Sequence, residues 1–327
     1  IQLRFHDWYL CGWSLHRDTV MGMIVVTPPA FCKSESLKSK LSSLFPNTVY
    51  NEKNDYLSES ELIEFLKGAD AAIIGRDPVT KATLEALPQL KMISKYGVGL
   101  DNLDIASIKE KGVEFAVTAG TNKRSVAELT LSFMLGLCHQ TFIGAERIKR
   151  GEWIREGGHD LSGKTIGIIG CGNVGKEVVQ LLKPFGCVIL VCDIEDRSEF
   201  CRDQGVAQSS FELLIEKSDI VTLHVPLTDL TRDMIDEAIL RKMPANAYLI
   251  NTSRGQVVNT SALHEALVTG AISGAALDVF CSEPPDDMAF LQLPNLMVTP
   301  HIGGNSVEAV EAMGQAAIDN LAKFFNK

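Results

Sequence analysis

The sequence predicts an α/β protein with two parallel sheets, and three observations lead to this fold class. Short apolar runs rich in β-branched residues alternate with helical stretches from Met23 to about Thr118, and a second series of the same kind begins at Thr165. Strands separated by helices of this length are typical of parallel sheets. The 327 residues exceed one ordinary domain, and a hydrophobic content of 46% is ample for two cores.

The first series contains expected strands at residues 24–27, 71–74, 92–95 and 114–117. Helices are expected at residues 35–44, 58–68 and 81–87. In the second of these helices, Ser58 is followed three residues later by Glu61, which is the spacing of a capping box, and Gly68 closes the helix.

Residues 121–150 differ, because they predict one long helix that is hydrophobic on almost every side between Ala127 and Leu137. Such a helix is expected to be buried on several faces, between domains or at a subunit interface. Residues 151–164 form a connection. The second series then predicts strands near residues 165–169, 187–192, 220–223, 247–251, 274–278 and 296–299. Residues 306–325 predict a single amphipathic helix, which is too short to be a domain and must dock on an existing one.

Composition argues against several classes of function. The net charge of −10 and the pI near 5.3 disfavour a nucleic-acid surface, and no apolar stretch approaches the roughly 20 residues of a membrane helix. No nucleic-acid or membrane partner is therefore expected. The eight cysteines include no C-x-x-C pair, so we expect reduced thiols and a cytoplasmic protein. Residues 1–22 show no sustained period and are expected to be an N-terminal extension outside the fold.

The most informative motif is Gly170-x-Gly172-x-x-Gly175, which directly follows an expected strand. Gly170 permits a tight turn, Gly172 lets a pyrophosphate approach the backbone, and Gly175 lets the next helix pack closely. The N–H groups at the start of that helix then face the phosphates, while Asp193, which ends the next apolar run, can accept a hydrogen bond from a ribose 2′-hydroxyl. Glycine loops also serve ordinary turns, but the strand, the helix and the acid together predict a dinucleotide site.

Three polar residues follow apolar runs later in the chain, namely Arg254, Glu283 and His301. Ligands of open α/β sheets bind beyond the carboxyl ends of the strands. An arginine can bind a carboxylate through two parallel hydrogen bonds. A histidine can donate a proton near neutral pH, and an adjacent acid orients that histidine. Each residue alone is more often a surface or loop residue, but their joint occurrence favours a site for keto-acid reduction. Asp278 ends an apolar strand, where we favour a functional acceptor, such as one for a nicotinamide amide, over a cap.

The glycine loop with Asp193, followed in order by TSRG, DVFCSEPP and TPHIGG, resembles the D-isomer-specific 2-hydroxyacid dehydrogenase family over about residues 23–325. The resemblance implies an NAD-dependent enzyme in which a Rossmann NAD-binding domain, residues 121–302, is inserted in a discontinuous flavodoxin-like substrate domain, residues 23–120 plus 303–327. It implies Arg254, Glu283 and His301 as catalytic residues, a small 2-hydroxy or 2-keto acid as substrate, and a homodimer formed through the 121–150 region. No metal is expected.

The resemblance also implies a wider set of contacts. The substrate contacts are Arg76, Val98, Gly99 and Arg254, although Arg76 could equally be a surface charge. Ser125 could face the nicotinamide, or it could be a cap or a hinge contact. The cofactor contacts are Ser125, Gly170, Gly172, Asn173, Val174, Gly175, Asp193, His224, Pro226, Thr252, Ser253, Asp278, Gly303 and Gly304.

Within the family, the segments GVGLDNLD and TNKRSVAE are most similar to phosphoglycerate dehydrogenases and to glycerate or hydroxypyruvate reductases. The leading substrate pair is therefore 3-phosphoglycerate and 3-phosphohydroxypyruvate, and glyoxylate, hydroxypyruvate or another 2-keto acid is the alternative. No C-terminal regulatory domain is expected.

An NAD-sensing, corepressor-like binding protein is the alternative of another class. A formate dehydrogenase is disfavoured, because Glu283 stands where such an enzyme is expected to carry an uncharged amide. Asp193 favours NAD over NADP, since a carboxylate repels a 2′-phosphate, although Arg197 could weaken that preference.

Overall fold

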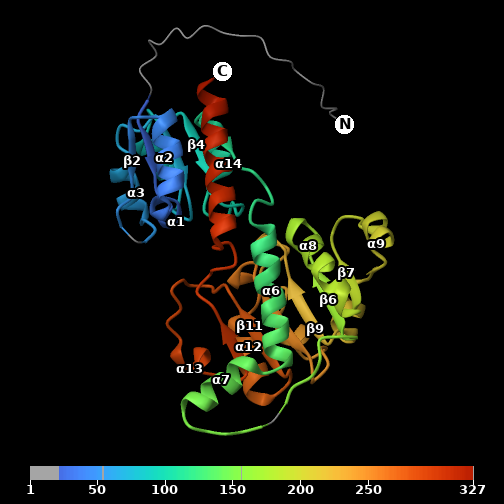
Figure 1. Cartoon of the computed structure of the whole chain (residues 1–327). Coiled ribbons are helices and arrows are strands. Elements are labelled where there is room, and N and C mark those ends of the chain that lie inside the picture. Colours follow the sequence, from blue (N-terminus) through green and yellow to red (C-terminus); the bar gives the residue numbers. More distant parts are fainter. Residues whose placement is uncertain (1–21, 54, 156, 327) are drawn as a thin grey trace.

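The computed structural model describes residues 22–53, 55–155 and 157–326, so the predicted extension lies outside the described residues apart from Gly22. The described chain forms two sheets, one of five strands in the order β2-β1-β3-β4-β5 and one of seven in the order β12-β11-β10-β9-β6-β7-β8 (Figure 1). Every strand pairing in the two sheets is parallel. The predicted fold class is confirmed.

The first sheet lies at the N-terminal end of the described chain and is covered by short helices. Its strands are β1 (Ile24–Val26), β2 (Thr48–Tyr50), β3 (Ala71–Ile74), β4 (Met92–Lys95) and β5 (Glu114–Ala116). The helices between them are α1 (Pro29–Lys33), α2 (Glu35–Leu44), α3 (Glu59–Phe65), α4 (Lys81–Ala86) and α5 (Ile105–Glu110).

The last helix of the chain, α14 (Val307–Phe325), returns to this first sheet, where it packs against β4 and α2 (Figure 1). The Ser94 hydroxyl on β4 donates a 2.9 Å hydrogen bond to the carbonyl of Ala317. Met313, Ile318 and Leu321 of α14 are buried in the same apolar core as β1 and α2. The domain built around the first sheet is therefore discontinuous in sequence.

The second sheet carries the larger part of the chain and begins with the strand before the glycine loop. Its strands are β6 (Thr165–Ile169), β7 (Val188–Cys192), β8 (Ala207–Gln208), β9 (Ile220–Leu223), β10 (Tyr248–Asn251), β11 (Gly274–Leu277) and β12 (Leu296–Val298). Its helices are α8 (Asn173–Leu182), α9 (Ser198–Gln204), α10 (Phe211–Lys217), α11 (Glu237–Leu240), α12 (Thr260–Thr269) and α13 (Met288–Leu291), with 3₁₀ turns at Lys183–Phe185 and Gly255–Val257. Because β6 pairs with both β7 and β9, the strand order reverses at β6.

The prediction of one long helix over residues 121–150 is wrong. The segment forms α6 (Lys123–Cys138) and α7 (Thr141–Lys149), whose axes differ by 64°. Gln140 lies between them with a left-handed φ of 51°, which interrupts the helical hydrogen bonds. Helix α6 packs on α8 and β10, whereas α7 has no buried residue. In the described chain no single helix is long and apolar enough to cross a membrane, and only the bent α6–α7 pair meets those criteria when taken together.

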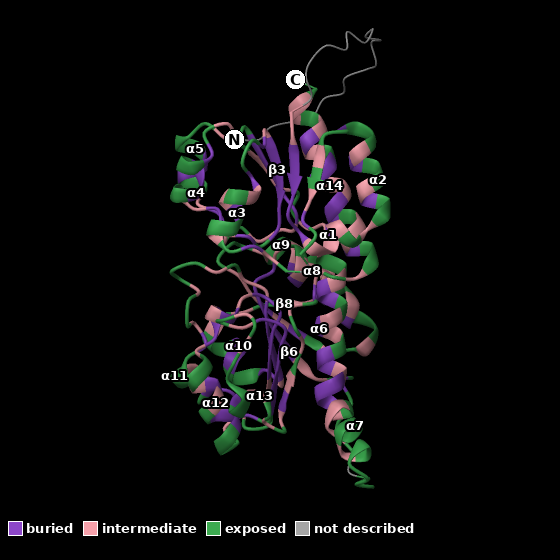
Figure 2. Cartoon of the chain, turned by 90° about the vertical axis from the view of Figure 1, so that its left-hand side faces the viewer, coloured by how far each residue is buried: buried purple, intermediate pink, exposed green. Residues whose placement is uncertain are grey.

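The two sheets lie end to end, and the buried residues gather along their strands and on the inner faces of the helices beside them (Figure 2). The chain crosses between the two parts after β5 and again before α14. Loops that follow strands of one sheet contact loops that follow strands of the other, as in the ion pair of Arg76 with Glu283. The carboxyl ends of both sets of strands therefore face a common region.

Candidate active site

The glycine loop joins β6 to α8 in the conformation that a dinucleotide requires. Gly170 has a φ of +90°, and a Cβ placed there would lie 2.6 Å from the carbonyl oxygen of His224. A Cβ on Gly175 would lie 2.1 Å from the carbonyl oxygen of Gly170, so only glycine allows α8 to approach the sheet. A Cβ on Gly172, the N-cap of α8, would meet nothing within 4 Å. The start of α8 is thus open to a phosphate group.

Asp193 follows β7 and lies beside this loop. Its carboxylate accepts hydrogen bonds from the N–H groups of Cys171 at 2.6 Å and Glu195 at 2.9 Å, and Arg197 Nε lies 3.4 Å away. Burial alone would raise the pKa of Asp193, but these N–H groups and Arg197 outweigh it and lower the pKa. Ile194, the residue after Asp193, is 96% exposed. These features fit a dinucleotide.

The other predicted cofactor residues of this sheet lie at the start of α8 or on loops after neighbouring strands. The ring of His224 lies 3.0 Å from the Thr222 hydroxyl, and burial lowers its pKa to about 3, so the ring is neutral. The Thr252 hydroxyl lies 3.2 Å from that of Thr130 on α6. Asn173 and Val174 open α8, Pro226 follows β9, and Ser253 follows β10.

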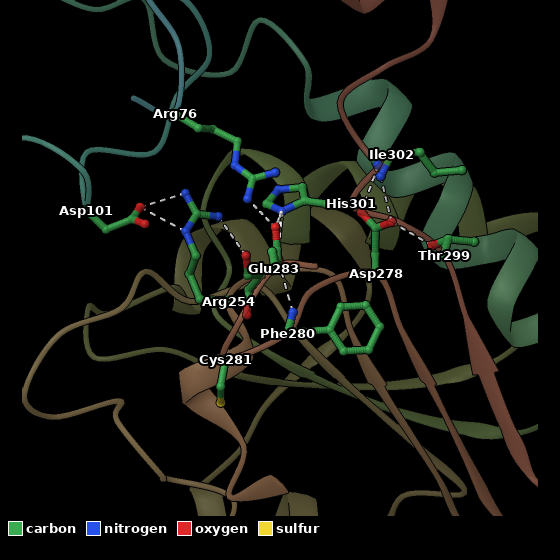
Figure 3. A network of polar contacts seen from close by, with 12 residues as sticks. Arg76, Asp101, Arg254, Asp278, Phe280, Cys281, Glu283, Thr299, His301 and Ile302 are labelled. Atoms are coloured by element: carbon green, nitrogen blue, oxygen red, sulfur yellow. Dashed lines mark hydrogen bonds and ion pairs between the residues drawn. The ribbon is translucent and has the colours of Figure 1, made fainter. Parts of the chain in front are cut away.

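Arg254, Glu283 and His301 follow β10, β11 and β12, and the structure places Glu283 against His301 (Figure 3). His301 Nδ1 lies 2.8 Å from Glu283 Oε2 and 3.0 Å from Oε1. Because Nδ1 is engaged in this way, Nε2 is the ring nitrogen left for a substrate oxygen. His301 also has a φ of 53°, in a region that residues other than glycine seldom occupy.

The Glu283 carboxylate is ionised in this setting. Burial alone would raise the pKa of Glu283, but the hydrogen bond and charge of His301, the N–H of Phe280 and the charge of Arg76 together lower it to about 2. The N–H of Phe280 lies 3.0 Å from Oε1 and fixes the carboxylate from its own loop.

Asp278, at the end of β11, is almost fully buried and holds the loop that carries His301. Its carboxylate accepts hydrogen bonds from the Thr299 hydroxyl at 2.6 Å and from the N–H groups of Ile302 and Gly303, both at 2.8 Å. Burial raises the pKa of Asp278, and these donors and His301 oppose that shift. The predicted contact with a nicotinamide amide stays a prediction.

Arg254 reaches from the second sheet to the loop after β4. Its Nε and Nη2 each lie 2.8 Å from Asp101 Oδ1, and its Nη1 donates to the carbonyl of Ser253 at 2.6 Å. A Cβ on Gly99 would lie only 1.7 Å from Nη2, so a side chain at this position would displace the guanidinium from where it now lies. The backbone at Val98 and Gly99 is therefore close to Arg254, as a shared carboxylate site needs. Asp101 was not singled out from the sequence, since its partner is known only from the packing of two separate loops.

Three further predicted residues, Ser125, Gly304 and Arg76, have structural contacts. The Ser125 hydroxyl donates a hydrogen bond to the carbonyl of Gly303 at 2.6 Å and accepts one from the N–H of Ser306 at 3.4 Å. It therefore links the two segments in which the chain passes between the two sheets. A Cβ on Gly304 would lie 2.9 Å from Asn122 at the same place. Arg76 pairs with Glu283 and lies over the Tyr56 ring. Among the described residues, no three His, Cys, Asp or Glu side chains are grouped to hold a metal ion.

Comparison with protein families gives one match that covers more than half of the chain. The family described as "D-isomer specific 2-hydroxyacid dehydrogenase, NAD binding domain" matches residues 131–303. This span includes the glycine loop, Asp193 and all three of Arg254, Glu283 and His301.

Individual proteins are similar over most of the chain. A glyoxylate reductase of Korarchaeum cryptofilum is 36% identical over 82% of this chain and 83% of its own length. A hydroxypyruvate reductase of Thermotoga maritima is 35% identical over 83% and 89%. A D-3-phosphoglycerate dehydrogenase of Methanocaldococcus jannaschii is 38% identical over 82% of this chain but only 52% of its own length. Among solved structures, a D-lactate dehydrogenase of Aquifex aeolicus, complexed with NAD and lactic acid, superposes with a TM-score of 0.82 at 26% identity, covering 93% of this chain and 95% of its own.

Proposed function

The chain belongs to the D-isomer-specific 2-hydroxyacid dehydrogenase family and is an NAD-dependent oxidoreductase, and from this premise we propose that it interconverts a short D-2-hydroxy acid and its 2-keto acid. The observation that carries the proposal is the ion pair of His301 with Glu283 beside Arg254, at the meeting of strand ends from both sheets. We assign residues 23–120 plus 303–327 to substrate binding and residues 121–302 to NAD binding.

In the proposed reduction, each of the three residues has one task. Arg254 and the N–H groups near Gly99 bind the carboxylate of the keto acid. His301 donates a proton from Nε2 to the C2 oxygen, while Glu283 holds Nδ1 and stabilises the protonated ring. NADH, when bound along the second sheet, supplies the hydride. Approach of the two domains excludes water, and oxidation is the reverse.

Among substrates, we place glyoxylate and hydroxypyruvate first and 3-phosphohydroxypyruvate second. The guanidinium of Arg76, which the sequence suggested for a phosphate, pairs instead with Glu283. A short keto acid needs no second cation beyond Arg254, whereas a phosphate would have to draw Arg76 away from Glu283. The similar proteins named glyoxylate reductase and hydroxypyruvate reductase support the same order.

The substrate order is tested by following NADH absorbance with glyoxylate, hydroxypyruvate, 3-phosphohydroxypyruvate, pyruvate and branched keto acids. We expect the highest kcat/KM with glyoxylate or hydroxypyruvate. Asp193 repels a 2′-phosphate, so NADPH is expected to be the poorer cofactor in the same assays. Faster reduction of the phosphorylated acid would reverse our order. Tight NADH binding without turnover of any acid would instead indicate a binding protein.

We also propose a homodimer formed through α6, α7 and the segment after them. Helix α7 projects from the second sheet (Figures 1 and 2) and is followed by Trp153, which is 78% exposed. Ile148 and Ile154 beside it are each 48% exposed, so an apolar surface remains for a partner.

Light scattering is expected to give twice the 35.7 kDa chain mass, and Trp153→Ser is expected to shift the population toward the monomer. Leu230→Ser, at a residue that is 82% exposed elsewhere, is the control and should leave the mass unchanged. A monomeric wild-type protein would contradict the proposal.

A further inference from the structure

We propose that Arg76 is a positioning residue that acts through Glu283 to weaken the hold of that carboxylate on the proton of His301. The inference deepens the proposed function, because it rests on His301 as the proton donor. Arg76 Nη2 pairs with Glu283 Oε2, which is the same oxygen that lies 2.8 Å from His301 Nδ1 (Figure 3). One carboxylate oxygen is thus shared between the guanidinium and the imidazole.

Arg76 and Glu283, which contact each other, come from different sheets. Arg76 follows β3 of the first sheet, whereas Glu283 follows β11 of the second. The guanidinium lies over the ring of Tyr56, 5.2 Å from its centroid. The contact between Arg76 and Glu283 therefore exists only while the loops of the two domains are close together.

The backbone before Arg76 is fixed by a buried cation. The carbonyl of Gly75 accepts hydrogen bonds from Lys95 Nζ and from Asn102 Nδ2, the latter at 3.1 Å. Lys95 is only 4% exposed and also donates to Asn102 Oδ1 at 2.9 Å. The loop that presents Arg76 is thereby tied to the loop that carries Asp101 and to the end of β4.

The effect on His301 follows from the charges that face each group. His301 faces the carboxylates of Glu283 and Asp278. Arg76 faces Glu283 and Tyr56, with Asp77 and Lys95 near by. Among the described residues, Glu283 is the carboxylate bonded to both Arg76 and His301.

A second cation on that carboxylate reduces the negative potential at Nδ1 and repels the protonated ring. The contact of Arg76 with Glu283 therefore eases release of the proton from His301 toward the substrate.

The rival role for Arg76 is that of a substrate ligand alone. In that case its removal raises KM, most strongly for a phosphorylated acid, and leaves the protonation of His301 unchanged. A positioning role instead changes the protonation of His301 even without any substrate. The two roles are therefore separated by a titration of the free protein.

The experiment follows the imidazole signals of the full-length protein by NMR as a function of pH, with His301 assigned from the spectrum of His301→Gln. Removal of a cation favours the protonated ring, so Arg76→Met is expected to move the His301 midpoint upward by about 0.5–1 pH unit. Arg76→Lys keeps the charge and is expected to move it less. Arg241→Met removes a 73% exposed arginine that pairs with Glu237, and this matched control is expected to leave the midpoint unchanged.

The pH dependence of kcat/KM is expected to shift in the same direction as the NMR midpoint. Reduction needs protonated His301, so the fall in kcat/KM at high pH is expected to move upward in Arg76→Met by the same amount as the NMR midpoint. A wild-type midpoint in Arg76→Met, whatever happens to KM, would overturn the inference. The NMR result does not depend on turnover, so failure of the proposed function would appear separately, as a wild-type protein that reduces none of the acids.

Discussion

Replacement of His301 by alanine is expected to lower the turnover of 2-keto acid reduction by about 10²–10⁴-fold. The variant has no group at the position of Nε2 to protonate the C2 oxygen as hydride arrives. The loop itself should persist, because Asp278 holds it through Thr299 and the N–H groups of Ile302 and Gly303. NADH binding should also persist, since the glycine loop and Asp193 lie elsewhere on the second sheet. Steady-state kinetics gives the loss, and NADH fluorescence titration checks binding.

A matched control for this variant is His159→Ala. His159 is an exposed histidine outside the candidate site, and its backbone N–H bonds to the carbonyl of Cys138. That hydrogen bond survives the substitution, so turnover should stay within about twofold of the wild type. If His301→Ala retained wild-type turnover, His301 would not be the proton donor.

Replacement of Arg254 by lysine is expected to lower kcat/KM by about 10²-fold, even though the charge is kept. The guanidinium bonds Asp101 and Ser253 at once and still has N–H groups for a substrate carboxylate, whereas a lysine ammonium cannot reproduce this planar arrangement. Loss of one or two charged hydrogen bonds, each of about 1.5–3 kcal/mol, accounts for a change of this size. The carboxylate is bound in the ground state as well as the transition state, so much of the loss should appear in KM.

The same substitution at an exposed helix serves as its control. Arg241→Lys, at an arginine that is 73% exposed, should leave both kinetic constants unchanged. If Arg254→Lys changed neither kcat nor KM by more than about twofold, the carboxylate would be bound by other groups.

Buried elements, and elements whose ends are marked by capping residues, were predictable from the sequence. Strands β3, β4, β6 and β9 have the predicted bounds, because strands buried on both faces carry mainly apolar residues. Helix α2 also has its predicted bounds. Helix α3 begins after Ser58, whose N–H and hydroxyl both donate to Glu61.

The missed elements lack those signals. Helix α1 begins at Pro29 after Pro28, and two prolines suggest a turn although a first-turn proline is compatible with a helix. Strands β2 and β8 are short edge strands with partly exposed residues, so no apolar run marks them. The break at Gln140 occurs at a residue that is neither glycine nor proline, so no helix-breaking residue marks it.

In the candidate site, too, some residues could be predicted from the sequence and others could not. Arg254, Glu283 and His301 could be selected because each follows an apolar strand run, and a parallel sheet brings such positions to one edge. The pairs of Asp101 with Arg254 and of Arg76 with Glu283 could not, because they join loops from different sheets. Such contacts depend on how the two domains pack, which local sequence patterns do not encode.

The central claim is that this protein reduces a short 2-keto acid to its D-2-hydroxy acid, with His301 as the proton donor. The most direct measurement is chiral analysis of the product formed from hydroxypyruvate and NADH, by wild-type protein and by His301→Ala in parallel. The wild type is expected to form D-glycerate, with one molecule formed for each NADH consumed, and the variant almost none. L-glycerate, a racemic product, or equal yields from the two proteins would contradict the account.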